Sequence, residues 1–216
     1  MTVHSRTKAV KIPLKDYVSW LETKPWIASA SLLEGVSLCS GTRLELRLTP
    51  EGHDQLRDAG WAEFERELWK GISSDAKAYP RIDFSPQDGA SEITSVLDGS
   101  GTFPRLLSSL VKPDHCRMLI YVDPGMCWFK GHFPGRAILP GVVQLHWAVS
   151  VSHSLFSTNT PPRAVNRLKF QNVVVPPRVI ELKLERKEEC RVAFTFQSLG
   201  FIHSSGVLRF DRTEPC

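Results

Sequence analysis

Two histidines are spaced so that they could act on one substrate. His132 stands between Gly131 and Gly135 in the stretch FKGHFPGRAILPGVVQLHWA, residues 129–148, and His146 follows near its end. The Pro-Gly step at 140–141 opens an apolar run, which predicts a tight loop followed by a buried helix. An imidazole beside a helix N-terminus can move a proton near neutral pH while free backbone N–H groups hold a developing oxyanion. The stretch therefore predicts an acid/base site.

The order of these residues resembles the hot-dog-fold 3-hydroxyacyl-[acyl carrier protein] dehydratases. That family's signature is Gly-His-Phe-Pro-Gly, then Pro-Gly-Val, then Glu-Ala, and its glutamate corresponds to His146 here. The helix segment VVQLHWA at 142–148 is similar to the branch associated with aryl polyene synthesis. The family's Lys-Phe-x-x-x-Val-x-Pro step also has a counterpart in LKFQNVVVP at 168–176. The resemblance covers about residues 113–212 and implies a hot-dog fold.

The resemblance also implies roles for individual residues. His132 would take the α-proton of a 3-hydroxyacyl thioester, a task that suits an imidazole with an ordinary pKa of about 6.5. The backbone N–H at the start of the helix would polarise the thioester carbonyl and so acidify the α-carbon. The expected catalytic residues are His132 and His146. The expected substrate-binding and oxyanion set is Phe133, Gly135, Gly141 and Val142.

His146 leaves two interpretations open. Elimination needs an acid for the departing hydroxyl, and His146 could donate that proton, orient a water or bind the 3-hydroxyl. Burial on an apolar helix would favour the neutral ring, which is a weaker acid. The alternative is that His146 packs in the core. Gln144 lies about 200° around the helix from His146 and is expected to face elsewhere. His153 shares a helix face with His146, but two histidines without a third ligand do not make a metal site.

The implied function is dehydration of 3-hydroxyacyl thioesters to trans-2-enoyl thioesters in polyene or fatty-acyl synthesis, without a cofactor. Two alternatives stay open, a thioesterase on the same fold and a non-catalytic subunit that binds an acyl chain or a partner enzyme. The implied partners are an acyl carrier protein and a second copy of the chain, with His132 approaching the partner's His146. A set of basic residues could meet the acidic carrier: Arg136, Arg163, Arg167 and Lys169.

Composition narrows the class of protein further. The 216 residues carry a mild net charge of +4 without a basic cluster, which does not favour nucleic-acid binding. The longest apolar stretch, 137–151, is too short and too polar to span a membrane, and no secretory signal is expected at the N-terminus. The five cysteines are scattered, which indicates reduced thiols in a cytoplasmic protein and no metal centre.

Hydrophobic periodicity predicts an α+β protein with two domains. In the second domain, 113–212, a strand at 117–123 leads into the histidine loop. A helix over 139–156 follows, and then strands at 164–170, 179–186, 192–199 and 202–210. One central helix with a run of antiparallel strands is the outline of a sheet wrapped around a helix.

The first domain, 1–100, is expected to be a small α+β unit. Helical spacing marks a segment from Leu14 to Leu21 and another over 54–72, and strict alternation marks a strand over 43–48. Residues 81–101 have no clear period and are expected to form a linker. The segments VKIPL at 10–14 and KPWIASA at 24–30 weakly resemble the C-terminal subdomain of adenylate-forming acyl ligases, without its catalytic lysine. The alternative is an unrelated small domain.

Overall fold

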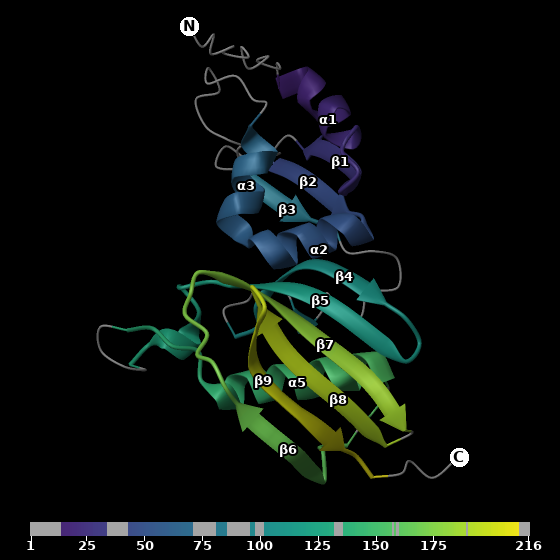
Figure 1. The fold of residues 1–216 in the computed structure, drawn as a ribbon, viewed down its shortest axis with the longest axis vertical. Helices are drawn as coiled ribbons and strands as arrows, with labels where there is room; N and C mark the ends of the chain where they lie inside the picture. Colours follow the sequence, from purple (N-terminus) through teal and green to yellow (C-terminus); the bar gives the residue numbers. More distant parts are fainter. Residues whose placement is uncertain are drawn as a thin grey trace, which may run out of the picture.

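The strands of the protein form two sheets. The computed structural model describes residues 14–33, 43–70, 81–85, 96–97, 102–131, 136–156, 158, 160–188 and 190–211. One sheet has three strands in the order β1-β2-β3, and the other has six in the order β4-β5-β7-β8-β9-β6. The smaller sheet and its helices lie against one end of the larger sheet, beside β4 and β5 (Figure 1).

The smaller sheet and three helices make up the N-terminal layer. Its core strand shows the expected alternation, since Leu44, Leu46 and Leu48 are buried while the residues between them are not. The first strand runs antiparallel to this core strand and the third runs parallel to it. The elements of this layer are α1 (Leu14–Glu22), β1 (Ile27–Leu33), β2 (Arg43–Leu48), α2 (Pro50–Ala59), α3 (Trp61–Trp69) and β3 (Arg81–Phe84).

Two expectations for this layer are wrong. The segment expected to be one helix over 54–72 is two helices, because Gly60 adopts a positive φ of 77° that closes α2 and redirects the chain into α3. The segment expected to be a linker begins with β3, which pairs with β2 over Arg81–Phe84. A four-residue strand is too short to show a period in the sequence.

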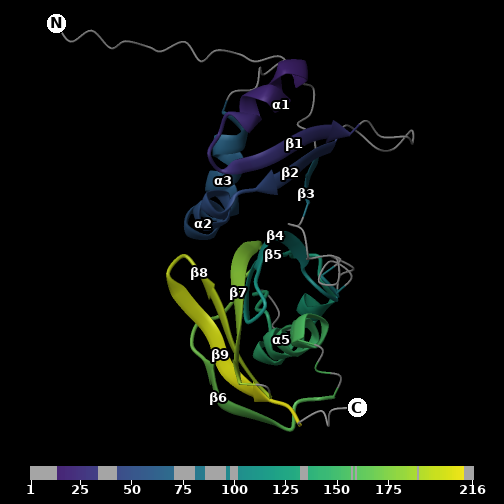
Figure 2. The same ribbon diagram turned by 90° about the vertical axis from the view of Figure 1, so that its right-hand side faces the viewer.

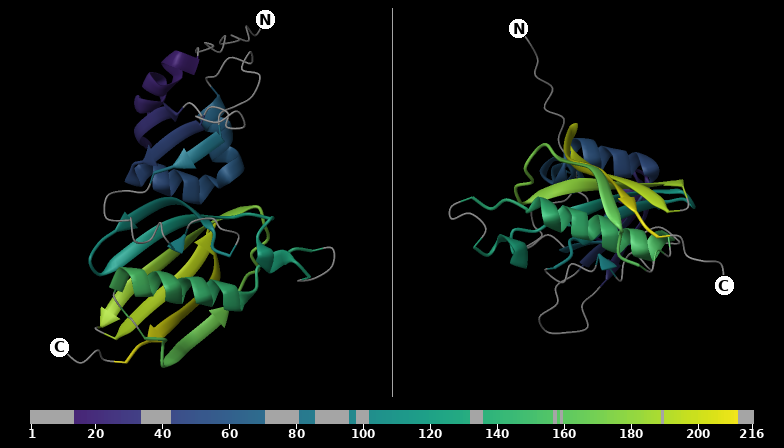
Figure 3. Two further views of the ribbon diagram at one scale, coloured as in Figure 1. Left: turned by 180° about the vertical axis from the view of Figure 1, so that it is seen from behind. Right: turned by 90° about the horizontal axis from the view of Figure 1, so that it is seen from below.

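The larger sheet confirms the expected α+β fold class. All of its neighbouring strands are antiparallel. The sheet curves around α5, which lies along its concave face (Figures 2 and 3). Trp147, Ala148 and Val151 of this helix are fully buried against the sheet. The elements are β4 (Arg105–Val111), β5 (His115–Val122), η1 (Cys127–Phe129), α5 (Gly141–Phe156), β6 (Ala164–Phe170), β7 (Arg178–Glu188), β8 (Arg191–Ser198) and β9 (Phe201–Arg209).

The N-terminal layer covers the convex face of the larger sheet at one end. Leu107, Leu119 and Val179, from β4, β5 and β7, belong to the same hydrophobic cluster as the N-terminal core. These strands are therefore buried on both faces. The division into domains at 1–100 and 113–212 stays a prediction, and the structure adds β4, which lies between those two ranges, to the larger sheet.

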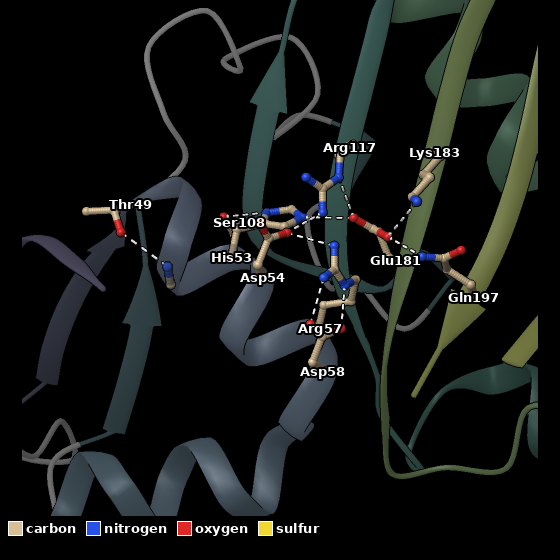
Figure 4. Close-up of polar contacts among 11 residues, drawn as sticks. Thr49, His53, Asp54, Arg57, Asp58, Ser108, Arg117, Glu181, Lys183 and Gln197 are labelled. Atoms are coloured by element: carbon tan, nitrogen blue, oxygen red, sulfur yellow. Dashed lines mark hydrogen bonds and ion pairs between the residues drawn. The ribbon is translucent and has the colours of Figure 1, made fainter. Parts of the chain in front are cut away.

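A buried polar network also joins the two layers (Figure 4). His53 of α2 is fully buried, and its Nε2 lies 3.2 Å from Glu181 Oε1 on β7. A carboxylate only accepts, so Nε2 donates to Glu181, and Nδ1 lies 3.0 Å from the Ser108 hydroxyl, within hydrogen-bond distance. Arg117 Nε and Gln197 Nε2 each donate to Glu181 at 2.7 Å. We call these five residues the interlayer network.

Glu181 is charged at the centre of this network. Burial alone would raise the pKa of its carboxyl, but the hydrogen bonds from His53 and Arg117, with the charges of Arg117 and Lys183, lower that pKa to about 2. Arg117 also pairs with Asp54 of α2. The N-terminal layer is therefore attached by hydrogen-bonded charges as well as by apolar contact.

Candidate active site at the start of the central helix

The structure describes half of the expected site. Gly141, Val142 and His146 lie on the first two turns of α5. His132, Phe133 and Gly135 lie outside the described residues. The described part of the site consists of the helix and the strands that pack around its first turn.

The first turn of α5 presents free backbone donors. The N–H groups of Val143 and Gln144 bond to the carbonyl of Pro140, at 3.1 and 3.4 Å. Within the described residues, the N–H groups of Gly141 and Val142 have no backbone acceptor. Such donors at the positive end of a helix dipole favour an oxygen that carries or develops negative charge.

Gly141 lies directly against the side chain of Phe170. A Cβ at this position would lie 2.4 Å from Cε1 of the Phe170 ring, which comes from the end of β6. The ring therefore lies directly against the start of the helix. The absence of a side chain at Gly141 leaves the backbone N–H accessible beside an apolar wall.

A cavity of about 370 Å³ opens at this point, and we call it the α5 cavity. It is formed by the chain that enters α5, by the segment that follows β6 and by β9. Val142 and Phe170 on its rim are 68% and 53% exposed, which is unusual for apolar residues beside a core helix. The lining residues are Ile138, Leu139, Pro140, Gly141, Val142, Gln144, Phe170, Gln171, Asn172, Val173 and His203.

The expected burial of His146 is wrong for the single chain. Its side chain is exposed, and its ring lies 5.3 Å from the ring of Phe103, centroid to centroid. No hydrogen bond to His146 occurs in the described part of the chain. The helix is apolar around most of its circumference, but the sheet covers only one side of it at this turn. The interpretation of His146 as a core-packing residue is therefore wrong.

The segment that bears Phe103 is fixed next to His146. The carbonyl of Thr102 accepts hydrogen bonds from two indoles, Trp128 Nε1 at 2.6 Å and Trp147 Nε1 at 3.1 Å. Trp147 is the next residue after His146, and Trp128 belongs to η1, just before the histidine loop. The two tryptophans therefore hold one face of the helix against the residues that precede β4.

Two polar residues of the cavity were not predicted as part of the site. Gln144 faces away from His146, as expected, but this places it in the cavity wall, where its Oε1 accepts from Ser204 Oγ at 2.7 Å. His203 of β9 donates from Nδ1 to the Asn172 carbonyl and accepts from Ser198 at Nε2, at 3.2 and 2.7 Å. Burial lowers the pKa of His203, which keeps this ring neutral. Only the alternation of β9 signals His203 in the sequence.

His153, the second histidine of α5, has a structural role. His153 Nε2 donates to the carbonyl of Thr160 at 3.1 Å and closes the turn after the helix. Among the described residues, no group of three His, Cys, Asp or Glu side chains could hold a metal ion. None of the described helices combines the length and apolarity needed to cross a membrane.

Comparisons with known proteins match part of the chain. Residues 108–207 match the family model described as ApeI-like, ApeI dehydratase. The bifunctional enzyme LpxC/FabZ of Porphyromonas gingivalis is 32% identical over 89 residues, which cover 38% of this chain. The match spans 19% of the length of that enzyme.

Two solved structures align with part of the chain. The dehydratase heterocomplex ApeI:P from Xenorhabdus doucetiae aligns at 24% identity over 50% of this chain and 98% of its own, with a TM-score of 0.47. The dehydratase domain of a mycocerosic acid synthase-like polyketide synthase aligns at 17% identity over 50% of this chain and 40% of its own, with a TM-score of 0.42.

Proposed function

We propose that this chain, whose residues 108–207 match the model of the ApeI-like dehydratases, removes water from 3-hydroxyacyl thioesters on an acyl carrier protein and forms trans-2-enoyl thioesters. One observation supports this proposal above all others. The family match includes α5, whose first turn presents free N–H groups to the α5 cavity, one turn before the exposed His146.

The proposed reaction uses these groups in one elimination. The N–H of Gly141 donates to the thioester carbonyl oxygen and stabilises the negative charge that forms there when the α-proton leaves. His132 accepts that proton from C2. The C2–C3 double bond forms as the C3–O bond breaks, and the hydroxyl leaves as water with a proton supplied by His146. Phe133, Gly135 and Val142 complete the proposed contacts with the acyl chain.

Exposure of His146 supports its proposed role as the proton donor. The ring is exposed in the single chain, so a bound substrate can reach it. The ring lies on the same side of α5 as the exposed Val142, one helical turn earlier. A substrate that contacts both residues would lie along this side of the helix.

A homodimer is part of the proposal. Strand β6 forms an edge of the larger sheet, and its residues from Asn166 to Phe170 are exposed. Sheet edges of this kind are usually covered. A second copy paired along β6 would cover Val142 and Phe170 and bring His132 to the partner subunit's His146. The exposed Arg167 and Lys169 of β6 are available to an acidic carrier protein. The proposed setting is cytoplasmic polyene or fatty-acyl synthesis.

Turnover by the full chain tests the proposal. Purified protein is mixed with 3-hydroxyacyl thioesters of several chain lengths on a carrier protein, and the products are identified by mass spectrometry. Loss of water without release of free carrier thiol is expected, and His132→Ala should abolish it. Release of carrier thiol would indicate a thioesterase instead. Equal, near-zero rates for wild type and His132→Ala would overturn the proposal in favour of a non-catalytic binding subunit.

A further inference from the structure

Gln144 is a buried amide with one half of its hydrogen-bonding capacity unused. The residue is 3% exposed, and Ser204 Oγ donates to its Oε1 at 2.7 Å. Among the described residues no hydrogen bond from its Nε2 occurs, and this atom is not one of the fully buried polar atoms that lack a partner, so it is open to the cavity. A donor that is open to a largely apolar cavity and has no protein partner can fix the orientation of a bound ligand.

The free amide faces the α5 cavity. Gln144 is one of the lining residues, and it lies one helical turn after Gly141. Side chains on a helix lean toward its N-terminus, so the amide of Gln144 extends toward the turn where the N–H groups of Gly141 and Val142 are free. Three donors therefore converge on one cavity that is otherwise largely apolar.

The wall behind Gln144 is rigid. Ser204 is fully buried on β9, and the adjacent His203 is fixed by hydrogen bonds at both ring nitrogens. The bond from Ser204 occupies the amide oxygen and leaves the N–H groups directed away from β9. The donor is thus oriented before any ligand arrives, and donors fixed in this way stabilise a developing charge most effectively.

We infer that Gln144 is a substrate-binding residue, whose amide N–H donates a second hydrogen bond to the thioester carbonyl oxygen beside the N–H of Gly141. This inference rests on the proposed function, because it assigns a further contact within the same site. Its ligand class is an acyl thioester with the carbonyl at the start of α5. Ser204 acts as a positioning residue, since it orients the amide and does not reach the ligand.

Substitution at Gln144 tests the inference. Gln144→Leu keeps the approximate volume and removes the donor, and kcat/KM for the carrier-bound thioester is expected to fall about 10- to 100-fold. Gln144→Glu keeps the acceptor for Ser204 but offers no donor to the carbonyl, so it should lose at least as much. Ser204→Ala should cost less, about 2- to 10-fold, because one neutral hydrogen bond is lost. Gln55→Leu, on α2, is the matched control with unchanged turnover.

A spectroscopic measurement separates binding chemistry from folding. A trans-2-enoyl thioester bound to the wild-type chain should show its carbonyl stretch at lower frequency than in water, because two donors polarise the bond. Part of this shift should disappear in Gln144→Leu, or in Gln144→Met if the leucine variant does not fold. Turnover within twofold of wild type together with an unchanged frequency would overturn the inference alone. A wild-type chain that neither dehydrates nor binds the thioester would overturn the proposed function and the inference together.

Discussion

Replacement of Glu181 by glutamine should destabilise the protein by about 3 kcal/mol at neutral pH. The carboxyl is fully buried, and its pKa is about 2 in the folded chain against an ordinary value of 4.5. At about 1.4 kcal/mol per pKa unit, this difference corresponds to about 3 kcal/mol. Loss of one partner from a buried ion pair costs about 3–5 kcal/mol, so an independent estimate has the same size.

The same residue predicts how stability depends on pH. A carboxyl whose pKa is lowered on folding stabilises the folded chain above its unfolded pKa, near 4.5, and loses that contribution as the pH falls toward 2. The wild-type free energy of unfolding should therefore fall between pH 5 and pH 2 by about 3 kcal/mol more than that of Glu181→Gln. The two proteins should converge in stability at the acid end of this range.

Urea unfolding followed by tryptophan fluorescence, at several pH values between 2 and 7, measures both effects. Glu185→Gln is the matched control, because Glu185 lies on the same strand and is exposed, and Lys187 is its single ion-pair partner among the described residues. Its substitution should change stability by less than about 0.5 kcal/mol. Parallel pH curves for wild type and Glu181→Gln, or a difference below about 1 kcal/mol at pH 7, would refute the argument that the interlayer network holds a charged carboxylate.

Three further outcomes are expected. Gly141→Ala should cost about 1–3 kcal/mol of stability, measured by thermal unfolding, because its Cβ would meet the Phe170 ring at 2.4 Å; an unchanged Tm would contradict this. Gly60→Ala should cost about 1–3 kcal/mol, since a φ of 77° with a ψ of 175° is a conformation essentially restricted to glycine, and Gly60→Asn should be no better tolerated in the same assay. His203→Gln should make the unfolding free energy less sensitive to acid below about pH 6.5, because the lowered pKa of His203 means that the unfolded chain binds a proton that the folded chain does not.

Much of the larger sheet could be predicted because its signals are local. The alternation of β8 and the apolar run of α5 reflect packing against one core, and both appear within short windows of sequence. Strand β4 escaped prediction because four consecutive residues are buried, two of them serines, so no period of two is visible. A strand that is buried on both faces does not show the alternation of apolar and polar residues that is typical of a strand with one face exposed to solvent.

Site residues could be predicted from the sequence only where they lie close together on one segment of the chain. Gly141 and His146 lie on one helix, and their spacing is visible in the sequence. The exposure of His146 is not visible in the sequence, because it depends on which side of the helix the sheet covers. The His53–Glu181 contact joins residues 128 positions apart, and Gln144 meets Ser204 across 60 positions. No local pattern encodes such pairs, since they arise only when the sheet closes around the helix.

Some strands of the larger sheet are buried on both faces and others are exposed. This difference predicts which strands open first when the protein unfolds locally. At β4, β5 and β7 both faces are dry, with α5 on one side and the N-terminal layer on the other. At β6 the strand is exposed and has a single hydrogen-bonded neighbour, β9. Backbone amides should therefore exchange with solvent fastest along β6 and slowest along β5. The strand that opens first, β6, is the one that a second copy would cover. Dimerisation would therefore stabilise the least stable strand of the sheet. It would also restrict the motion of Phe170 in the wall of the α5 cavity.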